Sequence, residues 1–421
     1  MDVDRSGENE NRGAPLLSAV RARDAELLKA LLWDEDDREV LHEAFSLAVR
    51  SSFGDVAQLL LQHGADASRC VPEELPSLRE AVDSGSPALV ELFLDGIIRE
   101  CPSKAELLEM ADLARHWQET GVEAELRHRT GSRDAVVRTR VEDDEYYDVG
   151  EFVLGGTTAR DGHGAILTRL EKTLGVHTPF EELMGRALAH AHQRHVAWGS
   201  VTILLSGRRD RETWTTAQAL RTHRDPFHRL FGAEVMRLTH LFDDSEEDTF
   251  AAPALEVFTG WSAEEEDLAV LTEVLVALGE HSDPRAAAAL LLHLDHPDAR
   301  IRQAVAQGLG WWSPPLPSFG DVRTALLRLM VDPDAEVRQA ACYSVAEGKD
   351  RDPVLTDAMA AALHDANRRV QLAAVYGLAL HGDERCVEAA RRLGPPRQPD
   401  HLYEEGCLGA AWRYGWRRKG L

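Results

Sequence analysis

The sequence predicts an all-α protein built as an α-solenoid, with a small β-hairpin or an extended loop in a connecting segment. Three observations support this fold class. Aromatic residues make up only 6% of the 421 residues while Ala and Leu are abundant, which favours closely packed helices. One set of similar segments lies near the N-terminus, and a second set with a different period lies in the C-terminal half. Segments that repeat in this way bury their apolar faces by stacking on their neighbours.

The N-terminal copies align without gaps. They are SAVRARDAELLKALL from Ser18, LAVRSSFGDVAQLLL from Leu47 and EAVDSGSPALVELFL from Glu80. Each copy predicts a short apolar helix around an Ala-Val pair, a polar turn and a second helix. Apolar residues of the second helix recur at positions i, i+1, i+4 and i+5, which places them on one stripe. One repeat cannot cover its own stripe, so neighbouring repeats must stack.

These copies resemble ankyrin repeats. The best match, in residues 48–68, contains a Gly54-Asp55 turn, an LLL run and the closing H-G-A-D that ends at Asp66. The TPLH opening of the family is absent from all copies. The resemblance implies a stack of three repeats over residues 14–117, after a disordered N-terminus at residues 1–13. Such a stack offers surfaces for binding other proteins.

The C-terminal copies are PDARIRQAVAQGLG from Pro297, PDAEVRQAACYSVA from Pro333 and ANRRVQLAAVYGLA from Ala366. They resemble HEAT repeats, whose second helix begins D-x-x-V-R. The resemblance implies that Arg302 and Arg338 form a ladder of side chains between neighbouring repeats. Both arginines are also candidates for partner contact. The resemblance further implies HEAT-like repeats over residues 211–393, and we expect a Pro-rich linker and a C-terminal capping helix at 394–421.

Residues 118–210 form a mixed connector between the two groups of repeats. Most of it predicts helices. Around residue 139, however, Val137, Thr139 and Val141 alternate with polar residues, and residues 151–154 have a composition that can pair with them. We therefore expect a β-hairpin or an extended loop there. The following Gly-rich segment from Gly155 matches no phosphate-binding pattern and predicts a flexible loop.

The histidines of AHAHQRH are the most conspicuous candidates for chemistry. We expect them at the end of a helix that begins near Thr178, with His192 and His195 on one face and His190 pointing elsewhere. Zinc requires three or four converging ligands, and no HExxH pattern or nearby carboxylate supplies them. The sequence therefore predicts no catalytic residue, no cofactor and no metal. The alternative is an enzyme or metal-binding protein with a His-rich site in the connector.

Charge restricts the partners. The chain has 47 Lys and Arg against 72 Asp and Glu, a net charge of −25, which opposes binding to nucleic-acid phosphates. No apolar run reaches the length of about 18 residues that spans a membrane, so no membrane segment is expected. The N-terminus lacks the basic start and apolar core of a signal peptide, which predicts a cytoplasmic protein.

Two acidic runs, at residues 142–151 and 243–248, are either solvated loops or a footprint for a basic partner protein. Contact candidates in the first run are Asp143, Asp144, Tyr146 and Tyr147. Trp311 and Trp312 end a repeat helix and are a further pair of candidates, or core residues at a repeat junction. The sequence thus favours a non-catalytic scaffold or adaptor that binds a basic protein. A narrower version is an inhibitor or immunity protein for such a partner.

Overall fold

The chain divides into two compact units, Met1–Leu205 and Ser206–Leu421. Helices dominate both units, and one small antiparallel sheet lies in the first, which confirms the predicted fold class. The computed structural model describes residues 13–32, 35, 37–70, 75–144, 146–190, 192–243, 249–310, 319–348, 351–397 and 401–419.

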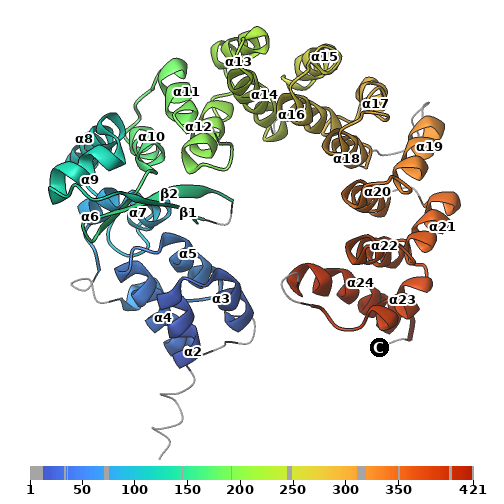
Figure 1. Ribbon diagram of the computed structural model, residues 1–421, viewed down its shortest axis with the longest axis horizontal. Helices are drawn as coiled ribbons and strands as arrows, with labels where there is room; N and C mark the ends of the chain where they lie inside the picture. Colours follow the sequence, from blue (N-terminus) through green and yellow to red (C-terminus); the bar gives the residue numbers. More distant parts are fainter. Residues whose placement is uncertain are drawn as a thin grey trace, which may run out of the picture. The chain divides into compact units, whose positions relative to one another are not determined.

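The first unit begins with three helix pairs (Figure 1). Their bounds are α2 Ala14–Ala22 and α3 Ala25–Leu32, α4 Arg38–Arg50 and α5 Gly54–Gln62, and α6 Leu78–Ser84 and α7 Pro87–Leu94. The Ala-Val pair of each first helix is buried, as its position in the repeat predicts. These helices share one hydrophobic core with residues of two later helices, so the stack does not end at residue 94. The assignment of residues 14–117 to the ankyrin family stays a prediction.

The later helices of this unit are α8 Lys104–Thr120, α9 Val122–Thr130, α10 His163–Thr173, α11 Phe180–Leu188 and α12 Val196–Ser206. A capping box of Ser103 and Glu106 starts α8, which packs against α10. The predicted helix through AHAHQRH is wrong. Helix α11 ends at Leu188, so all of the histidines in that segment lie in the loop before α12.

The sheet consists of β1 Val137–Glu142, β2 Asp148–Leu154 and β3 Thr157–Arg160, paired in that order. Val137 pairs with Val153 and Val141 with Val149, which is the expected hairpin. The third strand occupies the segment predicted as a flexible loop. Gly155 and Gly156 have φ of +59° and +79°, and two successive left-handed residues make the tight turn that returns β3 along β2.

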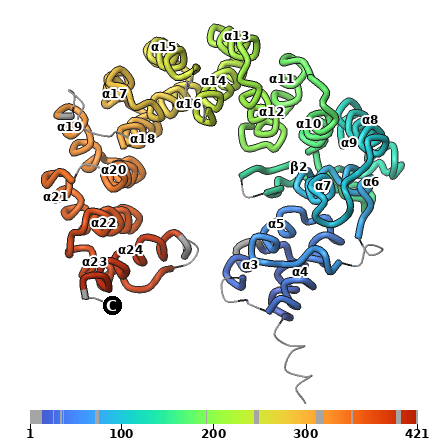
Figure 2. Tube along the Cα trace, turned by 180° about the vertical axis from the view of Figure 1, so that it is seen from behind, coloured from blue at the N-terminus to red at the C-terminus, as the bar shows by residue number. Residues whose placement is uncertain are grey.

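The second unit is a series of helix pairs. Its helices are α13 Arg211–Ala219, α14 Pro226–Leu241, α15 Ala251–Ser262, α16 Leu268–Gly279, α17 Pro284–Leu291, α18 Ala299–Gly308, α19 Phe319–Leu329, α20 Ala335–Glu347, α21 Pro353–Ala362, α22 Arg368–Leu380, α23 Arg385–Leu393 and α24 His401–Lys419. The second helices of the pairs lie side by side in one layer (Figure 2), and they are α14, α16, α18, α20, α22 and α24. Asp or Asn caps the N-terminus of several of them, as in Asp298, Asp334 and Asn367.

Small residues let neighbouring helices of this layer approach closely. A Cβ placed on Gly279 of α16 would lie 2.5 Å from the Cα of Gly308 in α18, so no larger residue fits there. Farther along, the Ser344 hydroxyl of α20 donates to the Ala306 carbonyl of α18 at 2.6 Å. The second helices are therefore held together by close approach of their backbones and by a hydrogen bond to a backbone carbonyl, as well as by apolar side chains.

Candidate functional site

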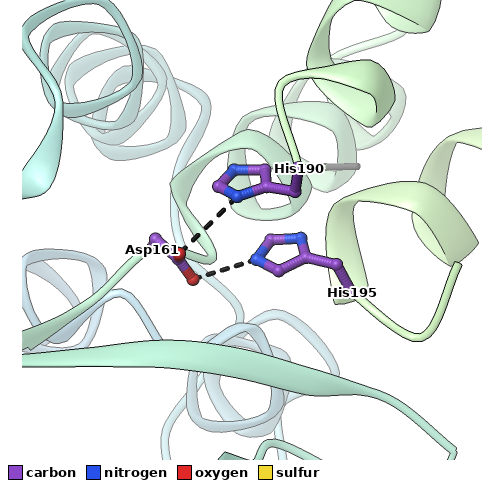
Figure 3. A group of neighbouring side chains, drawn as sticks. All are labelled: Asp161, His190 and His195. Atoms are coloured by element: carbon purple, nitrogen blue, oxygen red, sulfur yellow. Dashed lines mark hydrogen bonds and ion pairs between the residues drawn. The ribbon is translucent and has the colours of Figure 1, made fainter. Parts of the chain in front are cut away.

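The structure brings Asp161, His190 and His195 together in the first unit (Figure 3), and we call these residues the His–Asp cluster. Asp161 directly follows β3. Its backbone N–H donates to the Gly150 carbonyl at 3.0 Å, and its Oδ1 accepts the Gly150 N–H at 2.7 Å. Pairing with β2 therefore fixes the carboxylate. His195 Nε2 lies 2.9 Å from Asp161 Oδ1, and His190 Nδ1 lies 3.5 Å from Asp161 Oδ2. The two imidazole rings stack with centroids 3.7 Å apart.

The composition of this cluster differs from the expected one. His190, predicted to point elsewhere, stacks on His195, whereas His192 lies apart, near Asp148 at 3.5 Å. Arg140 donates to the Nε2 of His192 at 3.1 Å. The difference arises because the segment is a loop, in which residues five apart meet more easily than on a helix. The carboxylate comes from another element, so no spacing in the sequence reveals it.

Two further histidines of the connector, His163 and His177, lie outside this cluster. His163 starts α10, is fully buried, and stacks on Trp117 with centroids 4.6 Å apart. Burial lowers the pKa of His163 to about 4, so its ring is neutral in the core. His177 is exposed in the loop after α10. Neither histidine belongs to the group that surrounds Asp161.

Both ring nitrogens of His195 are already engaged. Nδ1 accepts the backbone N–H of Ala197 at 3.1 Å, which caps the first turn of α12. A nitrogen that accepts an N–H carries no proton, so the ring proton must lie on Nε2, where it is donated to Asp161. This assignment of the tautomer follows from the hydrogen-bond network. His195 therefore has no free nitrogen with which to take a proton from a substrate.

The same argument applies to a metal ion. Coordination needs a bare lone pair on Nε2, and a ligating histidine then carries its proton on the other nitrogen. A proton on Nδ1 of His195 would face the Ala197 N–H, so metal binding requires the cap of α12 to break. The geometry therefore fits a hydrogen-bonded clasp between the sheet and α12 better than a metal centre.

Charges within the cluster are consistent with this clasp. Burial alone would raise the pKa of the Asp161 carboxyl, but the hydrogen bond from His195 and the two imidazoles hold it below its usual value. Burial, with a smaller contribution from the neighbouring His195, lowers the pKa of His190 to about 4. At neutral pH the cluster accordingly contains an ionised carboxylate beside a neutral His190.

Asp143, predicted as a surface contact, is completely buried. Its Oδ1 accepts the Ser86 hydroxyl at 2.6 Å, and its Oδ2 accepts the Ala88 N–H at 2.9 Å. The carboxylate thus caps α7, where free N–H groups and the helix dipole favour negative charge. Arg160 of β3 lies 3.8 Å away. The prediction that Asp143 contacts a partner is therefore wrong, because the side chain joins the hairpin to the N-terminal helices.

The neighbouring candidates differ in exposure. Asp144 Oδ1 accepts the backbone N–H groups of Tyr146 and Tyr147, both at 2.7 Å, which shapes the hairpin turn. Tyr147 packs on α12, since a Cβ at Gly199 would lie 2.1 Å from its Cζ. Tyr146 is 69% exposed. A partner contact at Tyr146 stays a prediction. Glu145 and residues 244–248 of the acidic runs lie outside the described residues, as do Trp311 and Trp312.

Arg302 and Arg338 form the expected ladder. Arg302 makes two hydrogen bonds to Asp332, both at 2.8 Å, and Arg338 makes two to Asp365, at 2.7 and 2.8 Å. Each also donates to two carbonyls in the loop that precedes its own helix. The acceptor carboxylate belongs in each case to the loop before the next repeat's second helix. Partner contact through these guanidinium groups stays a prediction.

The ladder extends beyond the residues that the sequence singled out. Arg229 pairs with Glu265 at one end of the unit, and Arg368 pairs with Glu404 at the other, each through two hydrogen bonds of 2.7 to 2.9 Å. In the third copy Gln371 stands where Arg338 stands in the second, and it donates to the Asp365 carbonyl instead. Arg368 supplies the rung there, from a position that the D-x-x-V-R pattern does not include.

Comparison with known proteins identifies part of the chain. No curated protein matches it. Among solved structures it is similar to the X-ray structure of YibA from Escherichia coli, with 15% identity, a TM-score of 0.41, and coverage of 59% of this chain and 94% of that one. Within the described residues, no helix is both long enough and apolar enough to cross a membrane. Residues 288–379, from α17 to α22, match the family model of HEAT repeats, so this segment contains HEAT repeats.

Proposed function

We propose that this protein is a non-catalytic interaction scaffold that binds a basic partner protein through the surfaces of its repeats. The HEAT repeats in the second unit carry this proposal, because stacked helical repeats present extended surfaces suited to protein recognition. The engaged nitrogens of His195 support the non-catalytic part, since they remove the best general base of the His–Asp cluster.

The charge of the second unit supports a basic partner. Residues 243–298 contain 15 Asp and Glu and a single Lys or Arg, which is Arg285. Glu256, Glu264 and Glu266 of this stretch are exposed on α15 and the loop that follows it. A concentration of one sign of charge attracts a partner of the opposite sign and accelerates its association. We place the partner-binding face at this acidic stretch.

Affinity purification of the tagged full chain with mass spectrometry tests the proposal. We expect a reproducible basic partner whose retention falls steeply with salt. A variant with Glu256→Lys, Glu264→Lys and Glu266→Lys should lose at least ~10-fold in affinity for it.

The charge-matched control carries Glu100→Lys, Glu119→Lys and Glu181→Lys, all exposed in the first unit, and should bind like the wild type. If both variants capture the partner equally, the acidic stretch is not the binding face. If the wild type reproducibly captures no protein, the scaffold function itself is wrong.

A further inference from the structure

A cleft of about 220 Å³ lies in the first unit between α7, α10 and α12, and the hairpin turn closes one side of it. An engineered cavity of about 150 Å³ in another protein is large enough to hold benzene. The cleft therefore has room for a small organic molecule. The interaction surface proposed above lies in the other unit, so this site is independent of it.

Apolar side chains from three helices form the walls. Val90 of α7, Ile166 of α10 and Val196 and Leu204 of α12 line the cleft. The ring of Tyr147 adds an aromatic wall whose position is fixed by its packing on Gly199 of α12. Elements far apart in the sequence thus build a preformed, mainly apolar site of the kind that binds small ligands.

Opposite charges stand on different helices around these walls. The side chain of Glu91, from α7, accepts no hydrogen bond from the described residues, and burial raises the pKa of its carboxyl. Arg169 and Lys172 are three residues apart on α10 and hence share one face. The fourth charged residue, Asp144, already accepts two backbone N–H groups of the turn. The cleft therefore offers one carboxylate on one helix and two cations on another.

Arg169 is only partly satisfied within the protein. One of its terminal nitrogens donates to Asp95 at 2.9 Å, while its Nε is buried and has no hydrogen-bond partner among the described residues. Buried polar groups are nearly always hydrogen-bonded, so a buried N–H without a partner requires an explanation. This N–H has no accessible surface, so a molecule in the cleft contacts other atoms of Arg169.

We propose that this cleft binds a free α-amino acid with an apolar side chain. The ligand's ammonium group lies at Glu91, its carboxylate lies at Arg169 and Lys172, and its side chain contacts Val90, Ile166 and Leu204. A zwitterion matches both signs of charge at once, which neither a simple amine nor a simple acid does. Its carboxylate carries the charge opposite to those of Arg169 and Lys172, which line the cleft together.

Isothermal titration calorimetry on the full chain tests this site with L-leucine as the probe. We expect a dissociation constant of roughly 0.1 mM, as suits a ligand of this size. Isocaproate lacks the ammonium group and isoamylamine lacks the carboxylate, so each should bind at least ~10-fold more weakly than leucine. Either analogue binding as tightly as leucine would overturn the zwitterion assignment. The proposal is also overturned if none of the apolar amino acids binds at about 10 mM.

Glu91→Gln keeps the shape of the side chain and removes its charge, and it should weaken leucine binding at least ~10-fold. The control Glu109→Gln alters an exposed carboxylate of α8 and should bind like the wild type. Ser200→Phe is a second test, because it fills the cleft from α12, where the serine hydroxyl donates to the Val196 carbonyl of the same helix. Unchanged binding in Glu91→Gln or in Ser200→Phe would place leucine elsewhere and refute the proposal.

Discussion

The buried carboxylate of Asp143 should make the stability of the protein depend on pH. Burial raises its pKa from 3.8 to about 6 in the folded state, against the partly compensating effects of Ser86 and Arg160. Between these two pH values the unfolded chain releases the proton while the folded chain retains it. The contribution of this residue to folding stability is therefore fully present below pH 4 and is lost as pH rises through 6.

We expect the unfolding free energy of the wild type to fall relative to that of Asp143→Asn as pH rises from 4 to 7. A pKa moved from 3.8 to about 6 corresponds to about 3 kcal/mol. Urea unfolding of both proteins at several pH values measures this difference, and other titrating groups largely cancel in it. A difference that does not vary with pH, or that shifts in favour of the wild type as pH rises, would contradict the assignment.

His195 should stabilise the protein through both of its ring nitrogens. His195→Ala removes the cap of α12 and the bond to Asp161, which together should cost about 3 kcal/mol. His195→Asn restores a side chain suited to the capping position and should recover about 1 kcal/mol. Thermal and urea unfolding compare the two variants.

A chelator distinguishes the hydrogen-bonded clasp from a metal centre at the same residues. Because the proton on Nε2 is donated to Asp161, EDTA should leave the unfolding midpoint of the wild type unchanged. A fall in that midpoint, restored by a divalent metal, would show that the clasp is in fact a metal site.

The D-x-x-V-R pattern located the ladder arginines at the level of single residues, because their role follows from their place on a repeated helix. The partners of Asp143 and Asp161 could not be located in that way. Each carboxylate belongs to the sheet region and bonds to a different element, and only the folded chain brings them together. For Glu91 there was one signal in the sequence, a single charge within the apolar run PALVELFL.

Among the secondary-structure elements, the repeat helices and the β1–β2 hairpin followed from periodicity, since amphipathic stripes and alternation report directly on burial. The end of α11 did not. The residues after Leu188 suit a helix by propensity, but His195 is needed to cap α12, and this tertiary requirement overrides a weak local preference. Strand β3 was missed because its Gly-Gly turn reads as flexible until its two positive φ angles are known.

The rungs of the ladder connect neighbouring repeat elements, so removing one should weaken the second unit. Arg338→Gln imitates the third copy and breaks two hydrogen bonds to Asp365, with an expected cost of about 2 kcal/mol. Chemical unfolding measures it. The matched control is Arg300→Gln, since Arg300 is exposed and bonds within its own turn, and it should cause no measurable change. Equal effects of the two substitutions would show that the ladder is not stabilising.

At the scale of the whole molecule, the two compact units should unfold in separate steps. Each unit has its own buried residues, and domains of this size generally fold independently. A fragment of residues 207–421 should therefore give a helical circular dichroism spectrum and a cooperative thermal transition. Calorimetry of the full chain should show that transition together with a second one. A fragment that fails to fold would contradict the division into two units.

The cap that Asp143 places on α7 also has a consequence during protein synthesis. Ser86 and Asp143 are 57 positions apart, and the ribosome makes the helix before it makes the carboxylate. At ~5–20 residues per second, the interval is about 3 to 11 seconds. Throughout that time the nascent N-terminal helices lack the cap that completes α7. Emergence of the hairpin from the ribosome thus marks the moment when the first repeats reach their full stability.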